Sequence, residues 1–532
     1  MSAVIAVEVG RSHFVITPEP EPRASTSTPP IPIAPTPLNS RQKGGGELTH
    51  SLVQWAVFLG LSSLMALCTW AVTSRMGGRS SDSNSEYFLA GRNLTWPFIA
   101  GSITLTNLST DQLVGMNGNQ MLLLAWWELS ALAGLAMLAL VFLPIYFRNN
   151  CITTTELLER KYGSKYLRAT VSVLFLLGNI FIYLPIHLYT GALFLQSMFG
   201  GGASLMIIAA VLALVGAGYA ISGGLRAVAV YDTVAGVGIL GMAVLITVLA
   251  LRAIHFDFSG IPPERLTMLG GPHSPIPWPT LFTGMIFIQM FYWSTNQTIT
   301  QRAMAAPSLR EGQKGILAAM IIRLALVPAI VVLPGVCAYK LFGHTGDTTY
   351  GKLVGLIMPP WLSGAFAAFM AAAVLTGYIS LLNSSVTLYV CDLHEKFLAS
   401  KPDVGRLNLI ISLVFMAASI ALVPVYAGTA SIINLVQQLN GLLSMPILAT
   451  FILGLAFKGV DARAALFALI FGVVLYAGFT FVWTPLHYIH LMLITLIACL
   501  AFGLAINRWV FRGQASLGLR FGGRAAPVQV VP

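Results

Sequence analysis

A polar stretch interrupted by glycine lies inside an apolar segment of the chain, and this feature constrains the fold most. The sequence from Leu105 to Met116 reads LTNLSTDQLVGM within a segment long enough to cross a bilayer. Backbone groups left unpaired at membrane depth cost several kcal/mol each unless protein, water or a bound ion satisfies them. The segment therefore predicts a broken membrane helix that lines a polar cavity.

The composition places this segment in a membrane protein. Of 532 residues, 56% are hydrophobic and only 9% are charged, whereas soluble domains carry about 25% charged residues. Apolar runs of about 17–25 residues, the length that spans a bilayer, recur along the chain. They predict an all-α polytopic membrane protein with about 13 transmembrane helices. The runs cover residues 48–74, 98–119, 122–147, 166–197, 204–221, 231–253, 280–301, 315–342, 361–391, 407–425, 429–455, 464–484 and 487–507.

Topology explains the positive charge of the chain. A net charge of +11 would suit a nucleic-acid-binding protein, but cationic residues also gather on the cytoplasmic side of membrane proteins. With the N-terminus outside and the C-terminus inside, 21 of the 30 Lys and Arg residues fall in inner segments and 4 in outer loops. We therefore predict an N-out, C-in protein surrounded by membrane lipid, with no nucleic-acid partner.

The two ends of the chain differ from its middle. Residues 1–46 are rich in proline and glycine, a composition that cannot bury a core and predicts a disordered tail. A transmembrane domain is predicted over residues 47–510, followed by a cytoplasmic tail at 511–532. The five cysteines are scattered and form no CxxC pair, so we expect packing residues rather than metal ligands.

A second polar interruption occurs halfway along the chain. Residues 280–301 are apolar but contain Gln289, Tyr292 and the run WSTNQ at 293–297. Broken hydrophobic segments at corresponding places in two halves are typical of inverted repeats that meet at a central binding site. The segments at 98–119 and 280–301 are predicted to begin the two halves of a five-plus-five helix arrangement.

Several ordered motifs resemble those of a known family. They are YFLAGR at 87–92, NLSTDQ at 107–112, GGLRAV at 223–228, QRAMAA at 301–306, QKG at 313–315, LPG at 333–335 and LLNS at 381–384. With these motifs the chain resembles the solute:sodium symporter family, most closely its bacterial sodium/sugar members, from about residue 48 to 507.

This resemblance implies a fold and an activity. The fold is a leucine-transporter-type bundle with a ten-helix core at about 98–455, preceded by the helix at 48–74 and followed by two helices at 464–507. The activity is import of a sugar or polyol, driven by sodium through alternating access. It also implies a multi-pass protein of the bacterial inner membrane, compatible with a working monomer, with sodium as the coupling ion and no other cofactor.

The resemblance implies a set of solute-binding side chains. They are Gln112, Glu128, Gln289, Arg323 and Gln437. Sugar hydroxyls both donate and accept hydrogen bonds, so amides, a carboxylate and a guanidinium suit them. A charge at the bilayer centre costs at least about 2.5–3.5 kcal/mol, so Glu128 and Arg323 each require a partner. A salt bridge that only locks helices is the alternative for this pair, and an acidic sugar remains open for Arg323.

Three further side chains stand where the family places its gates. Met116, Trp127 and Tyr292 hold these positions, with Tyr292 as the inner gate, while Ile433 stands where an aromatic residue might be expected. His187 departs from the family pattern. We interpret it as a hydrogen-bonded packing residue.

The resemblance also implies an ion site with one ligand missing. Its sodium ligands are the main-chain carbonyls of Leu105, Leu108 and Ala373 and the hydroxyl of Thr376, but Gly377 stands where a second hydroxyl is expected. Ala373 cannot supply a hydroxyl for a second sodium, so we predict one ion per solute.

Other readings of the ion and of the function stay open. If only one sodium ion binds, Asp232 is a structural anchor at the inner side or an ion-linked group. Proton coupling through Asp111, Glu128 or Asp232 is the alternative to sodium coupling. Monocarboxylate symport and a solute sensor of the same fold also remain open. The chain has no nucleophile elbow and no phosphate-binding glycine loop, so no enzyme is predicted.

Overall fold

The structure is a computed structural model that describes residues 52–67, 92–108, 110–199, 203–398, 403–427, 429 and 431–518. The side chains of residues 105, 106 and 222–235 are not among those described. The predicted tail at 1–46, part of the first predicted helix, the side chain of Asp232 and residues 519–532 therefore lie outside the described residues.

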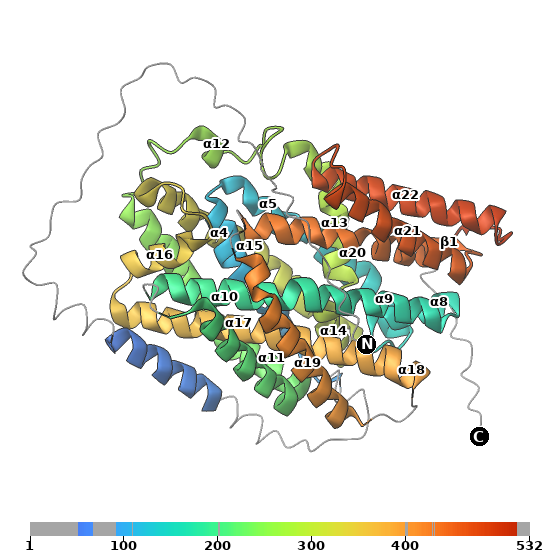
Figure 1. The fold of residues 1–532 in the computed structure, drawn as a ribbon, viewed down its shortest axis with the longest axis horizontal. Helices are drawn as coiled ribbons and strands as arrows, with labels where there is room; N and C mark the ends of the chain where they lie inside the picture. The colour runs from blue at the N-terminus through green and yellow to red at the C-terminus, as the bar shows by residue number, and fades with distance from the viewer. Residues whose placement is uncertain are drawn as a thin grey trace, which may run out of the picture. The chain divides into compact units, whose positions relative to one another are not determined.

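The described chain is almost entirely helical (Figure 1). After a helix at Leu52–Leu67, the first half contains α3 (Trp96–Asn107), α4 (Thr110–Asn119), η2 (Leu122–Ala125), α5 (Trp126–Leu129), α6 (Ala131–Met137), η3 (Leu138–Phe142), α7 (Leu143–Arg148), α8 (Thr154–Tyr162), α9 (Lys165–Gly178), η4 (Asn179–Tyr183), α10 (Leu184–Met198), α11 (Leu205–Ala253) and α12 (Pro263–Leu266). Here η2 is a 3₁₀ turn, and η3 and η4 are π-helical turns.

The second half continues in the same way. It contains η5 (Trp278–Phe282), α13 (Gly284–Ser294), α14 (Gln297–Met304), α15 (Leu309–Phe342), η6 (Gly346–Thr348), α16 (Thr349–Ile357), α17 (Pro360–Leu388), η7 (Tyr389–His394), α18 (Glu395–Phe397), α19 (Val404–Tyr426), α20 (Ile432–Ala456), β1 (Phe457–Lys458), α21 (Ala462–Phe481), α22 (Tyr488–Trp509) and β2 (Ser516–Leu517). The strands pair antiparallel, Phe457 opposite Leu517, and join the start of the predicted C-terminal tail to the end of α20.

Apolar helices occur among the described residues at the predicted segments, with one clear difference. Among the described residues, nine helices are long and apolar enough to cross a bilayer, and Leu52–Leu67 and Leu205–Ile221 are shorter apolar helices. The spans predicted at 204–221 and 231–253 form one helix, α11, of 49 residues. It measures about 74 Å at 1.5 Å per residue, against about 30 Å of hydrocarbon. The backbone is helical through residues 222–230, which separate the two predicted spans.

Small residues bring the helices around the two breaks close together. Gly134 of α6 packs on α13, where an added Cβ would lie 2.3 Å from the carbonyl oxygen of Gln289. Gly335 of α15 packs on α4 in the same way, 2.2 Å from the carbonyl oxygen of Asn117, and its N–H donates to Asn117 Oδ1 at 2.7 Å. In lipid the hydrophobic effect does not drive helices together, so their association depends on close packing, which small residues allow. These contacts hold α4 against α15 and α13 against α6.

Candidate substrate and ion site

Both predicted interruptions are breaks in the helices. α3 ends at Asn107, where Leu108 leaves helical geometry with ψ of 63°, and α4 begins at Thr110. α13 ends at Ser294, and α14 begins after Asn296, whose side chain caps it by accepting from the N–H of Thr298 at 2.9 Å. The two breaks expose backbone and polar side chains to the same interior space.

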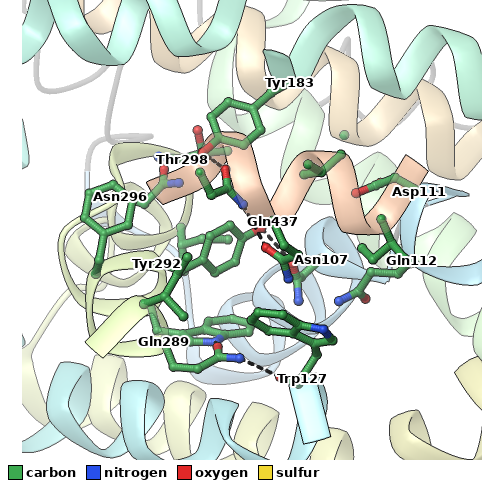
Figure 2. A pocket seen from close by; sticks show the side chains of 18 of the residues that line it. Asn107, Asp111, Gln112, Trp127, Tyr183, Gln289, Tyr292, Asn296, Thr298 and Gln437 are labelled. Atoms are coloured by element: carbon green, nitrogen blue, oxygen red, sulfur yellow. Dashed lines mark hydrogen bonds between the residues drawn. The ribbon is translucent and has the colours of Figure 1, made fainter. Parts of the chain in front are cut away.

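A cavity lined by polar and aromatic side chains lies between these breaks. Figure 2 shows side chains from both broken helices and from α20 converging on it. It is lined by Asn107, Asp111, Gln112, Met116, Trp127, Glu128, Tyr183, His187, Ile288, Gln289, Phe291, Tyr292, Trp293, Asn296, Thr298, Ile299, Gly377, Leu381, Ile433, Val436, Gln437 and Asn440. Four of the five predicted solute-binding residues and all three predicted gates are among them, together with Ile433.

The fifth predicted residue, Arg323, lies behind the cavity wall and pairs with Glu128. Its guanidinium donates to Glu128 Oε2, and both side chains are 1% exposed. The other oxygen, Oε1, accepts from the Gln112 amide at 2.5 Å. Arg323 also donates to the carbonyl oxygen of Thr104 at 3.1 Å and stacks over Trp293. The carboxylate thereby neutralises the guanidinium.

Two cavity-lining atoms keep hydrogen-bonding capacity. Among the described residues, Gln112 Oε1 and Trp127 Nε1 are buried and have no hydrogen-bond partner. One is an acceptor and the other a donor. A buried polar group without a partner is costly and calls for an explanation, and a bound solute would satisfy both atoms.

The predicted residue Gln289 is occupied by its neighbours. Its amide nitrogen donates to the carbonyl oxygen of Trp127 at 2.6 Å and to Ser130 Oγ at 3.0 Å. Its oxygen accepts from Trp293 Nε1 at 2.9 Å. Gln289 therefore lines the cavity while positioning two tryptophans.

Amide and hydroxyl pairs border the rest of the cavity. Tyr292 donates to Asn107 Oδ1 at 2.7 Å, and Asn440 donates to Gln437 Oε1 at 2.9 Å while accepting from the Tyr183 hydroxyl at 2.5 Å. Sequence reasoning missed Tyr183 and Asn440 as cavity residues. Asn440 follows Gln437 by three residues, so the helical period alone places both on one face.

The predicted sodium ligands lie on two helices. Leu105 is on α3, Leu108 is at its C-terminal cap, and Ala373 and Thr376 lie on α17. The Thr376 hydroxyl donates to the carbonyl oxygen of Ala373 at 3.0 Å, so an ion between these two oxygens would meet both. Their role as ligands stays a prediction.

At one end of the cavity α4 packs tightly on neighbouring segments. An added Cβ at Gly115 would lie 3.0 Å from Ile432 and Ile433, and one at Gly118 would lie 2.7 Å from Asp347 Oδ1. Asp347 Oδ2 accepts from the N–H of Ile432 at 3.0 Å, at the start of α20. Burial raises the pKa of Asp347 to about 6, because removal from water disfavours the charged carboxylate.

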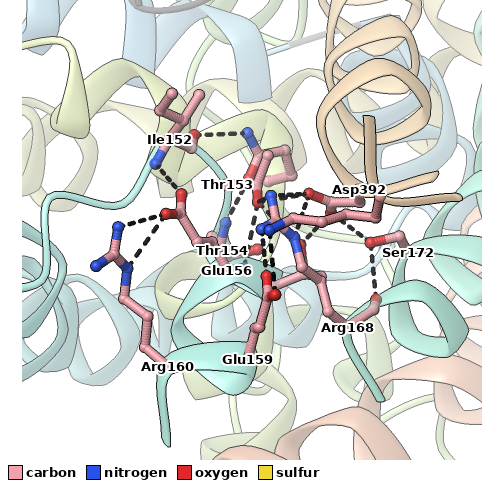
Figure 3. Close-up of polar contacts among 12 residues, drawn as sticks. Ile152, Thr153, Thr154, Glu156, Glu159, Arg160, Arg168, Ser172 and Asp392 are labelled. Atoms are coloured by element: carbon pink, nitrogen blue, oxygen red, sulfur yellow. Dashed lines mark hydrogen bonds and ion pairs between the residues drawn. The ribbon is translucent and has the colours of Figure 1, made fainter. Parts of the chain in front are cut away.

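A second polar cluster surrounds Asp392 (Figure 3), and none of the residues labelled there lines the cavity. Asp392 is fully buried and accepts from Thr153 at 2.9 Å, from Arg168 Nε at 2.7 Å and also from Thr155 and Ser172. Arg168 and three hydroxyls satisfy its charge, so it can be buried between α8, α9 and η7.

Comparisons with known proteins agree with this architecture. The model of the Sodium:solute symporter family matches residues 87–472. The chain is 33% identical to the uncharacterized symporter YidK of Escherichia coli K12 over 466 residues, which cover 82% of this chain and 80% of that protein. It is 28% identical to the sodium/glucose cotransporter of Vibrio parahaemolyticus over 489 residues, covering 84% and 88% respectively.

A solved structure confirms the fold. A sodium-coupled sialic acid symporter in a substrate-bound, outward-open state matches with a TM-score of 0.74 at 18% identity, over 88% of this chain and 99% of that one. This likeness shows a leucine-transporter-type fold, and the family match identifies a multi-pass secondary transporter and not an enzyme. The chain belongs to the sodium:solute symporter family, and the resemblance seen in its motifs is confirmed.

Proposed function

We propose that this protein imports a neutral sugar or sugar-like polyol across a bacterial inner membrane, coupled to sodium by alternating access. The observation that carries the proposal is the pair of unpartnered polar atoms in the cavity, Gln112 Oε1 and Trp127 Nε1. A hydroxyl group can donate to the first and accept from the second. A polyol offers several such groups.

The paired charges favour a neutral solute over an acidic one. Arg323 is bound by Glu128 and lies behind the wall, so it offers no free cation to a carboxylate. This argues against a monocarboxylate or an acidic sugar. Trp127, Tyr292 and Trp293 supply flat apolar surfaces of the kind that cover sugar rings. The relative named for glucose transport is consistent with this class of solute.

One sodium ion per solute is sufficient for accumulation. Its ligands would be the carbonyls of Leu105, Leu108 and Ala373 and the hydroxyl of Thr376. Each 100 mV of membrane potential supplies about 2.3 kcal/mol per charge, and about 1.4 kcal/mol corresponds to a tenfold gradient. A neutral solute would be concentrated without a second ion, and a monomer suffices for this cycle.

Counterflow in proteoliposomes tests the proposal and separates it from a sensor. Vesicles loaded with unlabelled glucose are diluted into labelled glucose, with sodium on both sides. A transporter predicts transient accumulation of labelled glucose. Excess galactose or myo-inositol should reduce this accumulation if the site accepts polyols, and excess lactate should not reduce it. Binding of these solutes without counterflow would favour the sensor, and counterflow of labelled lactate without counterflow of labelled glucose would favour a monocarboxylate symporter.

A further inference from the structure

The missing hydroxyl at Gly377 is matched by a histidine. A Cβ added to Gly377 would lie 2.6 Å from both Cδ2 and Nε2 of His187, closer than real side chains approach. Any hydroxyl side chain at this position would displace the imidazole. The ring of His187 therefore occupies the side-chain space of the position next to Thr376, where the family resemblance placed the second hydroxyl.

The hydrogen bonds of the ring fix which nitrogen can take up a proton. Nδ1 lies 3.1 Å from the carbonyl oxygen of Tyr183, and because a carbonyl only accepts, Nδ1 carries the hydrogen. In the neutral ring Nε2 then holds the lone pair. This nitrogen faces Asp111 Oδ1 at 3.6 Å. Protonation of Nε2 would place a positive charge directly against the carboxylate.

The surroundings of the ring contain few other described charges. Asp111 and His187 both line the cavity and are partly shielded from solvent, with side chains 18% and 11% exposed. The cavity lining also includes Glu128, which Arg323 neutralises, and Tyr183 and Tyr292. The elements packed on α10 add Arg252, Lys352 and Arg406, which are all exposed. They also add Tyr219, Tyr350, Tyr378, which bonds Ser419, Tyr426, which bonds the Phe181 carbonyl, and Asp347, which bonds the N–H of Ile432.

We propose that His187 and Asp111 form a proton-binding site beside the sodium site, and that a proton there and a sodium ion weaken each other's binding. The inference rests on the proposed sodium coupling. Two positive charges in one cavity repel each other, and both are attracted by the negative charge of Asp111. Sodium affinity should therefore fall when a proton binds between His187 and Asp111.

Sodium binding to the purified full-length protein tests this without knowledge of the solute. The half-saturating sodium concentration is read from the thermal shift in NaCl, with KCl holding ionic strength constant, at pH 8 and pH 5.5. We expect it to rise at least fivefold at the lower pH. Because coupling is reciprocal, adding NaCl but not KCl at pH 6.5 in weak buffer should release protons to an indicator dye.

Two variants assign the effect to the pair. His187→Gln retains a polar side chain without a basic nitrogen, and it should reduce the ratio of the two half-saturating concentrations to about one. Asp111→Asn removes the carboxylate and should also bring the ratio of the two half-saturating sodium concentrations close to one. The second variant keeps the test decisive if the first fails to fold. The exposed loop residue His273 provides the matched control, since His273→Gln should keep the full pH dependence.

The outcomes separate this inference from the proposed function. Equal sodium affinity at both pH values with no proton release would overturn the His187 proposal and leave sodium coupling intact. A pH dependence that both variants retain would also overturn it. Absence of any sodium effect at either pH would instead remove sodium coupling, and the proton site beside it would lose its basis.

Discussion

The guanidinium of Arg323 is held by the carboxylate of Glu128 across 195 residues of sequence, and the two side chains bury their charges beside the cavity. Breaking a buried ion pair leaves one charge uncompensated, which is strongly destabilising. The pair should therefore stabilise the protein, and under the proposed function it leaves the solute no unpaired charge at this part of the cavity.

Removal of the guanidinium should destabilise the protein. Arg323→Gln leaves Glu128 buried without its cation and should lower the free energy of unfolding by about 3–5 kcal/mol. The matched control is Lys314→Gln on the same helix, because Lys314 is 64% exposed in its pair with Glu311 and should contribute less than about 1 kcal/mol. Thermal denaturation in detergent compares the two. Equal losses would contradict the structural role of the buried pair.

The indole N–H of Trp127 should contribute to solute affinity. Trp127→Phe keeps an aromatic ring but removes the donor, and loss of one hydrogen bond should raise the half-saturating solute concentration about two- to tenfold. Trp126→Phe is the control, because the Trp126 Nε1 donates to the Met268 carbonyl at 2.8 Å outside the cavity lining. Uptake kinetics measure both variants, and unchanged kinetics for Trp127→Phe would exclude a direct bond to solute.

The hydroxyl of Thr376 should contribute to sodium affinity. Thr376→Ala removes one predicted ligand and should raise the half-saturating sodium concentration about tenfold, with a smaller effect on the maximal rate. Thr387→Ala on the same helix removes a buried hydroxyl that donates to the Asn383 carbonyl at 2.7 Å, so it controls for loss of an intrahelical bond. If the two variants shift sodium dependence equally, Thr376 is not a ligand.

Asp347 should make stability depend on pH. Burial raises its pKa to about 6 from an ordinary 3.8, so between these values the folded protein binds more protons than the unfolded chain. Its contribution to stability therefore rises as pH falls through 6, by about 1.4 kcal/mol from pH 8 to 5. Asp347→Asn should lack this gain.

The control for that experiment is an exposed aspartate with the opposite shift. A hydrogen bond from Lys340 lowers the pKa of Asp257, so this carboxylate stays ionised in folded and unfolded chains from pH 5 to 8. Asp257→Asn should leave the pH dependence of stability in that range as it is in the wild type. A wild-type profile that Asp347→Asn does not alter would contradict the assignment to Asp347.

The sequence predicted features that follow from local chemistry. The breaks at 98–119 and 280–301 were predictable because polar residues and glycine interrupt apolar runs there, and they appear as α3–α4 and α13–α14. The need of Glu128 and Arg323 for partners followed from the cost of a buried charge. That they would pair with each other depends on the packing of α5 against α15, which no local pattern in the chain encodes.

Features that depend on tertiary contacts could not be predicted from the sequence. Arg168 and hydroxyls more than 200 residues earlier enclose Asp392. Two separate spans were predicted at 204–221 and 231–253, yet α11 runs through both without a break. A sequence also shows neither the approach of His187 to Gly377 nor Asp111 opposite its Nε2.

Uptake driven by an imposed ion gradient tests the central claim most directly. Proteoliposomes with the purified protein are given labelled glucose and an inward gradient of sodium, potassium or protons. The account predicts accumulation above the external concentration with sodium, none with potassium, and loss of uptake when the sodium gradient is collapsed. Accumulation driven by protons alone, with sodium having no effect, would contradict it.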